Sequence, residues 1–118
     1  MVVKRIVADI AADYVAGVRA FYAEVFDLSV AMDFGWIATL ASGEDSGVQI
    51  SIASEGGSGT PVPDLSIEVD DLEVVLARAK ARGIAVEYGP VEEPWGVRRF
   101  FMRDPAGKLL NVLMHSAD

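Results

Sequence analysis

The two halves of the sequence repeat one order of elements, and this duplication restricts the fold more than any other feature. Each half has the pattern of a strand, a helix preceded by an aspartate, and three further strands. The two aspartates, Asp13 and Asp71, lie almost half the chain apart and are expected to cap their helices. One such module alone would bury its apolar face poorly. The prediction is an α+β fold in which two tandem βαβββ modules form a curved mixed sheet around a concave cavity, with the helices on the convex face.

Alternation and turn residues set the expected boundaries. Residues 1–118 are taken as a single domain, with one module over 2–53, a flexible linker over 54–63 and a second module over 64–115. The expected strands are 3–11, 28–32, 36–41, 48–53, 64–69, 84–88, 97–103 and 108–114. Apolar stripes at helical spacing indicate the core-facing sides of the two helices, which are Tyr14, Val18, Phe21, Tyr22 and Val25 in the first and Leu72, Val75, Leu76 and Ala79 in the second. The second helix is expected to stop at Gly83, after Lys80 and Arg82.

Composition excludes several classes of function. The chain has no cysteine, so disulfide scaffolds, thiolate metal sites and cysteine nucleophiles are excluded. The formal net charge of −8 disfavours nucleic acid and favours neutral or cationic ligands. No apolar run is long enough to span a bilayer, and the N-terminus lacks the pattern of a signal peptide, so we expect a cytoplasmic protein with no membrane partner.

Polar residues that alternate with the apolar set are expected to line the concave face. Aromatic residues near strand ends could form flat walls there. Arg98 and Arg99 are neighbours on one strand, so one of them is expected to face the cavity. The alternative interpretation is a solvated sheet face, whose acids are either exposed to water or hydrogen-bonded to Arg98, Arg99 or Arg103. The candidate ligand-binding residues are Asp9, Trp36, Gln49, Ser51, Asp64, Ser66, Glu68, Tyr88, Trp95, Arg98, Phe101 and Asn111.

Three stretches resemble the vicinal oxygen chelate superfamily, which includes glyoxalases, bleomycin-resistance proteins and extradiol dioxygenases. Residues 21–28 (FYAEVFDL) resemble the end of the family's first helix. Residues 64–71 (DLSIEVDD) resemble its fifth strand. Residues 95–100 (WGVRRF) and 104–110 (DPAGKLL) resemble its last two strands. Their order and spacing cover essentially the whole chain, and the resemblance implies a homodimer.

The resemblance also identifies the positions that hold a divalent ion in metal-using members. These positions correspond to Val7, to Gln49 or Ser51, to Asp64 and to Asn111. Only Asp64 is a strong ligand, so at most a weak Mg²⁺ or Ca²⁺ site is expected, and we predict no metal and no cofactor. The single histidine, His115, is expected in a solvated C-terminal tail.

The expected function is therefore metal-free binding of a small organic molecule, cationic or aromatic, in the concave cavity. The alternative is a lyase, isomerase or dioxygenase-like enzyme with a non-standard metal site around Asp64 or a carboxylate general base such as Asp64 or Glu68. A third possibility is an interaction module whose pocket is vestigial. No catalytic residue is assigned, because serine hydrolysis would need a histidine base and only His115 is present.

Overall fold

The computed structural model describes residues 1–43, 47 and 49–116, so the expected strand residue Val48 lies outside the described residues. The predicted α+β class is confirmed, with the order βαβββ occurring twice along the chain. The chain divides into two compact units, one formed by residues 7–62 and the other by residues 1–6 together with the chain from residue 63 on. One boundary thus falls inside strand β1 (Val3–Ala11), between Ile6 and Val7, and the other between Val62 and Pro63, at the end of the expected linker.

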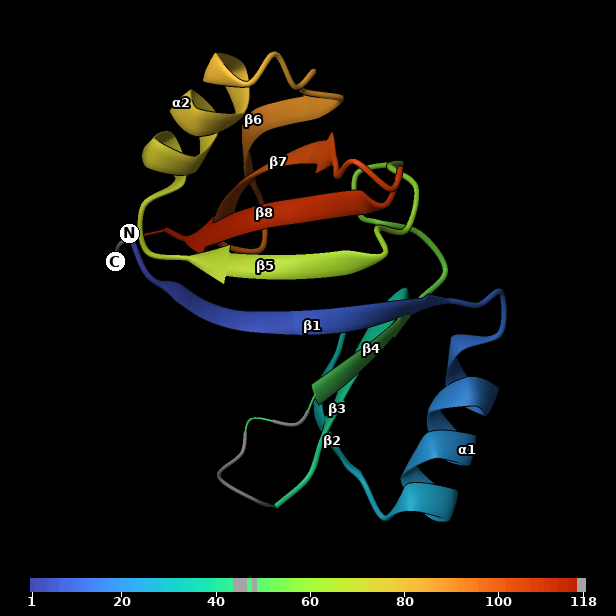
Figure 1. Cartoon of the computed structure of the whole chain (residues 1–118). Coiled ribbons are helices and arrows are strands. Elements are labelled where there is room, and N and C mark those ends of the chain that lie inside the picture. The colour runs from blue at the N-terminus through green and yellow to red at the C-terminus, as the bar shows by residue number, and fades with distance from the viewer. Residues whose placement is uncertain (44–46, 48, 117–118) are drawn as a thin grey trace. The chain divides into compact units, whose positions relative to one another are not determined.

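The unit of residues 7–62 is a mixed sheet covered by one helix (Figure 1). Its strand order is β2-β3-β4-β1. Strand β1 pairs parallel with β4, whereas β3 is antiparallel to both β2 and β4. Val15, Ala38, Leu40 and Ile52 form its buried core. The elements after β1 are α1 (Val15–Phe26), β2 (Ser29–Asp33), β3 (Ile37–Ala41) and β4 (Gln49–Ala53).

Helix α1 differs from the expected helix in its start and in its buried face. Its N-cap is Tyr14 without a side-chain cap bond, so the expected cap by Asp13 is wrong. Val15, Val18 and Tyr22 pack on the sheet, whereas Tyr14, Phe21 and Val25 are exposed. The expected stripe began one residue too early. Val18 and Tyr22 of the expected stripe are confirmed, whereas a shift of one position, about 100° around the helix, puts Val15 in the core in place of Tyr14.

The unit that contains residues 63 onward has the same architecture, with strand order β5-β8-β7-β6 (Figure 1). Strands β5 and β8 are parallel, and the other pairs are antiparallel. Its core consists of Val69, Leu72, Leu76, Phe100 and Val112, which places α2 on one face of the sheet. Its elements are β5 (Leu65–Val69), α2 (Leu72–Ala81), β6 (Tyr88–Glu93), β7 (Val97–Arg103) and β8 (Leu109–His115).

Local signals predicted both ends of α2 correctly. The Asp71 carboxylate accepts a hydrogen bond from the backbone N–H of Val74 at 3.3 Å. The helix ends at Arg82, and Gly83 adopts the left-handed φ of 72° that favours glycine. None of the described helices is long and apolar enough to cross a membrane.

The expected strand over residues 84–88 is wrong, because β6 begins at Tyr88. The backbone N–H of Ile84 donates to the carbonyl of Ala79 and so completes the helix end instead of pairing in a sheet. The actual strand contains Pro90, which is tolerated because β6 is an edge strand. Its pairing with β7 is irregular between Tyr88 and Val91.

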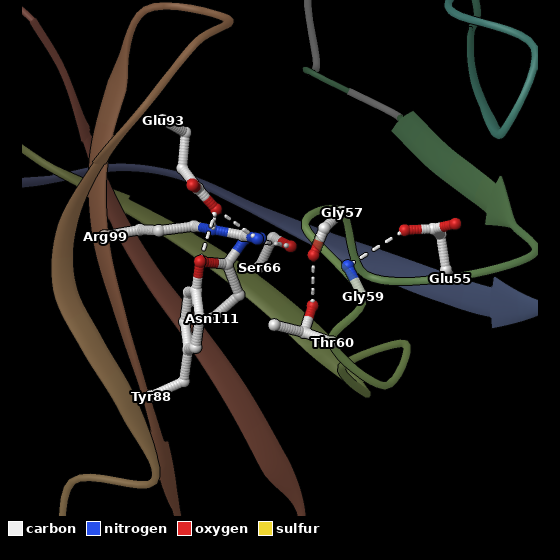
Figure 2. Close-up of polar contacts among 9 residues, drawn as sticks. All are labelled: Glu55, Gly57, Gly59, Thr60, Ser66, Tyr88, Glu93, Arg99 and Asn111. Atoms are coloured by element: carbon white, nitrogen blue, oxygen red, sulfur yellow. Dashed lines mark hydrogen bonds and ion pairs between the residues drawn. The ribbon is translucent and has the colours of Figure 1, made fainter.

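The expected flexible linker contains a hydrogen-bonded loop. The backbone N–H of Gly56 donates to the carbonyl of Thr60 at 2.8 Å, and the Thr60 hydroxyl donates to the carbonyl of Gly57 at 2.8 Å. The Glu55 carboxylate accepts from the backbone N–H of Gly59 at 3.1 Å (Figure 2). These bonds close the loop on itself.

Gly56 is the position of this loop that should tolerate a side chain least. A Cβ atom there would collide with the backbone oxygen of Pro61 and the hydroxyl of Thr60. We expect Gly56→Ala to lower the free energy of unfolding by about 1–3 kcal/mol, measured by urea denaturation. Gly43→Ala is the matched control, since a Cβ at Gly43 meets no atom of the described residues within 4 Å. Equal stability of the two variants would contradict this loop structure.

Candidate functional site

The sheet face opposite α2, in the unit of β5 to β8, gathers most of the candidate residues. Phe100 and Val112 lie under α2, so their neighbours along the strands point to the other side. The register places Asn111 opposite both Ser66 and Phe101, and Phe101 opposite Tyr88. We call this side the Arg99 face and define it by Ser66, Tyr88, Arg99, Phe101 and Asn111.

A buried ion pair forms the centre of the Arg99 face. The Arg99 Nη2 and Glu93 Oε2 atoms are 2.6 Å apart, and both side chains are 3% exposed. The Arg99 Nε also donates to this oxygen at 2.7 Å, and the Tyr88 hydroxyl donates to it at 3.0 Å (Figure 2). One carboxylate thus neutralises the buried guanidinium and fixes the tyrosine ring.

Three aromatic rings surround this guanidinium. The Arg99 Cζ atom lies 4.8 Å from the ring centroid of Phe101, 4.9 Å from that of Trp95 and 5.3 Å from that of Tyr88. These distances are in the range of cation–π interaction. Phe101 is fully buried, whereas Trp95 and Tyr88 are half-buried. The accessible parts of this cluster are therefore the edges or faces of the Trp95 and Tyr88 rings.

Arg98 does not lie on the Arg99 face. Its guanidinium donates to Glu73 of α2 at 2.8 and 3.0 Å, which places it on the helix-covered side. Among the candidate ligand-binding residues, Arg99 therefore replaces Arg98. The sequence could not choose between the two arginines, because Phe100 and Phe101 are both apolar and either could have been the core residue. Glu93 was also missed, because its strand was expected at residues 84–88.

Asn111 has one amide end without a partner. Its Nδ2 donates to the Ser66 hydroxyl at 3.1 Å (Figure 2). Asn111 is only 8% exposed, and its buried Oδ1 has no hydrogen-bond partner among the described residues. An unpaired buried acceptor costs about 1–3 kcal/mol and is rare in folded proteins. Such an atom is suited to accept a hydrogen bond from a ligand.

The carboxylates expected as general-base candidates already have partners. The Asp64 Oδ2 accepts from the backbone N–H of Leu109 at 2.7 Å. Glu68 pairs with Arg5 at 3.0 Å and with His115 at 3.1 Å. Neither acid is paired with Arg98, Arg99 or Arg103, the partners that the alternative interpretation named. His115 is the last residue of β8 and contacts Glu68, so its expected place in a C-terminal tail is wrong, although its side chain is exposed.

The remaining candidates belong to the unit of residues 7–62. Ser51 is buried, pairs in register with Asp9 and Thr39, and shares a 2.8 Å hydrogen bond with the Thr39 hydroxyl. Gln49 is half-buried on the same strand. Trp36 precedes β3, and its ring centroid lies 6.4 Å from that of Phe34. The expectation that these residues line one cavity with the Arg99 face stays a prediction.

Comparison with protein families decides the identity of the fold. The model of the Glyoxalase/Bleomycin resistance protein/Dioxygenase superfamily matches residues 7–112. The chain belongs to this superfamily. No functionally curated protein matches it in sequence.

Several solved structures share the fold of this chain, although their sequence identity to it is low. A hypothetical protein from Bacillus halodurans C-125 is 19% identical with a TM-score of 0.76, and the match covers 100% of this chain and 98% of that one. A superfamily member from Vibrio splendidus 12B01 is 17% identical with a TM-score of 0.66, covering 97% and 99%. Methylmalonyl-CoA epimerase from Mycobacterium tuberculosis is 15% identical with a TM-score of 0.64, covering 98% and 88%. These similarities concern the fold alone.

The residues of this superfamily member do not fit a transition-metal site at the four positions identified above. The Val7 side chain has no donor atom. At the second position the Ser51 hydroxyl is bonded to Thr39, and Gln49 offers only a neutral amide. Asn111 offers only a neutral amide, and Asp64 is the single carboxylate. In the part of the chain that the structure describes, no three His, Asp or Glu side chains gather as metal ligands. The set thus lacks the imidazole ligands that zinc and iron prefer.

Proposed function

We propose that this superfamily member binds a small organic molecule without a metal, through the Arg99 face. One observation carries the proposal: the buried Oδ1 of Asn111, which has no partner among the described residues, lies on the same sheet face as the aromatic cluster around Arg99 and Glu93. A flat ligand would pack against Trp95 and Tyr88 and donate a hydrogen bond to Asn111. The homodimer is part of the same proposal and rests on the superfamily resemblance.

The local charges favour a neutral or cationic ligand. Glu93 already neutralises Arg99, so this guanidinium has little attraction left for an anion. The Asn111 Oδ1 can only accept, which requires an N–H or O–H group on the ligand. The net charge of −8 adds a long-range preference for cations. The favoured class is an aromatic amine or alcohol.

Trp95 provides a fluorescence test of this ligand class. The chain has two tryptophans, so Trp36→Phe leaves Trp95 as the only indole reporter. We expect 2-phenylethylamine, and more weakly 2-phenylethanol, to change the Trp95 emission in the presence of EDTA. The matched anion 3-phenylpropionate should leave this emission unchanged. A response to the anion alone, or a response that requires added metal, would refute the proposal.

Replacing Asn111 with leucine should separate stability from binding. The variant removes a buried acceptor that has no partner among the described residues, but also the hydrogen bond from Nδ2 to Ser66, so we expect the free energy of unfolding in urea to stay within about 1 kcal/mol of the wild type. Binding of 2-phenylethylamine should weaken by about tenfold or more, because the acceptor is lost. Thr39→Val is the control, since it removes a satisfied hydroxyl and should cost about 1 kcal/mol in stability while binding persists. Unchanged amine binding by Asn111→Leu would exclude Asn111 from the site.

A further inference from the structure

A cavity lies at the end of α2, where residues 82–87 meet the end of β7 and the turn that follows it. Its volume is about 380 Å³, within the range of about 300–1,000 Å³ typical of small-molecule sites. Arg82, Glu87, Arg103 and Asp104 contribute its charged lining. It shares no lining residue with the Arg99 face.

Three of the four charged residues that line this cavity are already engaged. The Arg103 Nε lies 2.8 Å from Glu87 Oε2, and the Arg103 Nη1 donates to the carbonyl of Gly107 at 2.9 Å. The Oδ1 of Asp104 accepts from two backbone N–H groups of its own turn, each at 2.9 Å. These contacts hold one wall of the cavity. Arg103 neutralises Glu87, whereas Asp104 keeps its negative charge and is held in place by backbone N–H groups.

Arg82 is the fourth charged residue of the lining. Its side chain is exposed at the C-cap of α2, and among the residues that the structure describes it has no hydrogen-bond or ion-pair partner. Arg78 and Lys80 precede it in the last turn of the helix, so this end of α2 is basic although the whole chain is acidic. Arg82 is thus the charged lining residue whose side chain has no polar contact with the described residues, and its planar guanidinium matches the geometry of a carboxylate.

The uncharged part of the lining is apolar. Ile84, Ala85 and Pro105 contribute it, and Ala85 and Pro105 are exposed. An apolar group placed against them would be removed from water, which favours binding. A ligand for this cavity therefore needs a hydrocarbon part of modest size and one negative group within reach of Arg82.

We propose that the cavity at the end of α2 binds a small apolar monocarboxylate, with its carboxylate paired to Arg82 and its hydrocarbon part against Ile84, Ala85 and Pro105. This site selects the charge opposite to that favoured by the Arg99 face. The two proposals are independent, because they use different residues and different ligand classes.

Titration calorimetry with 3-phenylpropionate tests this proposal directly. We expect saturable binding to the wild-type chain, weakened about tenfold or more in Arg82→Gln. Arg78→Gln is the matched control, because Arg78 is a neighbouring basic residue outside the cavity lining, and its affinity should stay within about twofold of the wild type. The neutral analogue 3-phenylpropanamide should bind the wild type more weakly than the acid.

Two results would overturn the proposal. The first is the absence of saturable 3-phenylpropionate binding by the wild type, and the second is equal weakening by Arg82→Gln and Arg78→Gln. Arg82→Lys keeps the charge but not the planar fork, so it should retain part of the affinity. Asn111→Leu should leave this binding unchanged, which distinguishes the site from the Arg99 face. Circular dichroism of each variant should show the wild-type spectrum, since Arg82 and Arg78 are exposed.

Discussion

Replacing Glu93 with glutamine should lower the free energy of unfolding by about 3–5 kcal/mol. The substitution leaves the Arg99 guanidinium, which is 3% exposed, without the carboxylate that neutralises it. A buried charge that loses its partner bears its full desolvation cost, while the Tyr88 hydroxyl loses its charged acceptor as well. Urea denaturation at neutral pH measures this loss.

Two controls isolate the ion pair as the cause. Glu92→Gln changes an exposed neighbour on the same strand and should cost no more than about 0.5 kcal/mol. The double variant Glu93→Gln with Arg99→Met removes both charges and should recover most of the stability lost by the single variant. Equal stability of Glu93→Gln and Glu92→Gln would contradict the buried pair.

Phe100→Ala should have a comparably large effect, about 3–5 kcal/mol. Phe100 is 0% exposed and packs in the core formed by Leu72 and Leu76 of α2 with Val69 and Val112 of the sheet. Its removal leaves a cavity that rigid strands cannot fill, so both the transfer energy and the cavity energy are lost. Thermal or urea unfolding would measure the effect.

Phe21→Ala is the informative comparison for this prediction. The apolar stripe of the sequence predicted Phe21 in the core, whereas the structure leaves it 53% exposed on α1. Its ring contacts Tyr22 and Phe26, so we expect a loss of about 1 kcal/mol or less. A loss as large as that of Phe100→Ala would show that the original stripe was correct.

Local signals explain why much of the fold could be predicted. Asp71 and Gly83 mark the ends of α2 by capping chemistry, which depends on the few residues around each position. Strands β5 and β7 lie within one residue of their expected ranges. The range of strand β6 was not predicted, because it contains Pro90. An edge strand tolerates this proline, but the sequence does not show that β6 lies at the sheet edge.

The sequence predicted several residues of the Arg99 face but not the buried ion pair at its centre. Ser66, Tyr88 and Asn111 could be named because each alternates with apolar residues or ends a predicted strand. The choice of Arg99 over Arg98 depends on which phenylalanine lies under α2, and that is decided by tertiary packing. Glu93 matters only through its partner, and the sequence does not show which acid meets which arginine.

The most direct test of metal-free binding at the Arg99 face is a nitrogen–proton correlation spectrum of the EDTA-treated chain during titration with 2-phenylethylamine. The account predicts saturable shifts that are largest for the Trp95 indole N–H and the Asn111 side-chain amide, with small shifts at Arg82. Shifts that appear only after metal is added, that concentrate elsewhere, or that are absent altogether would contradict it.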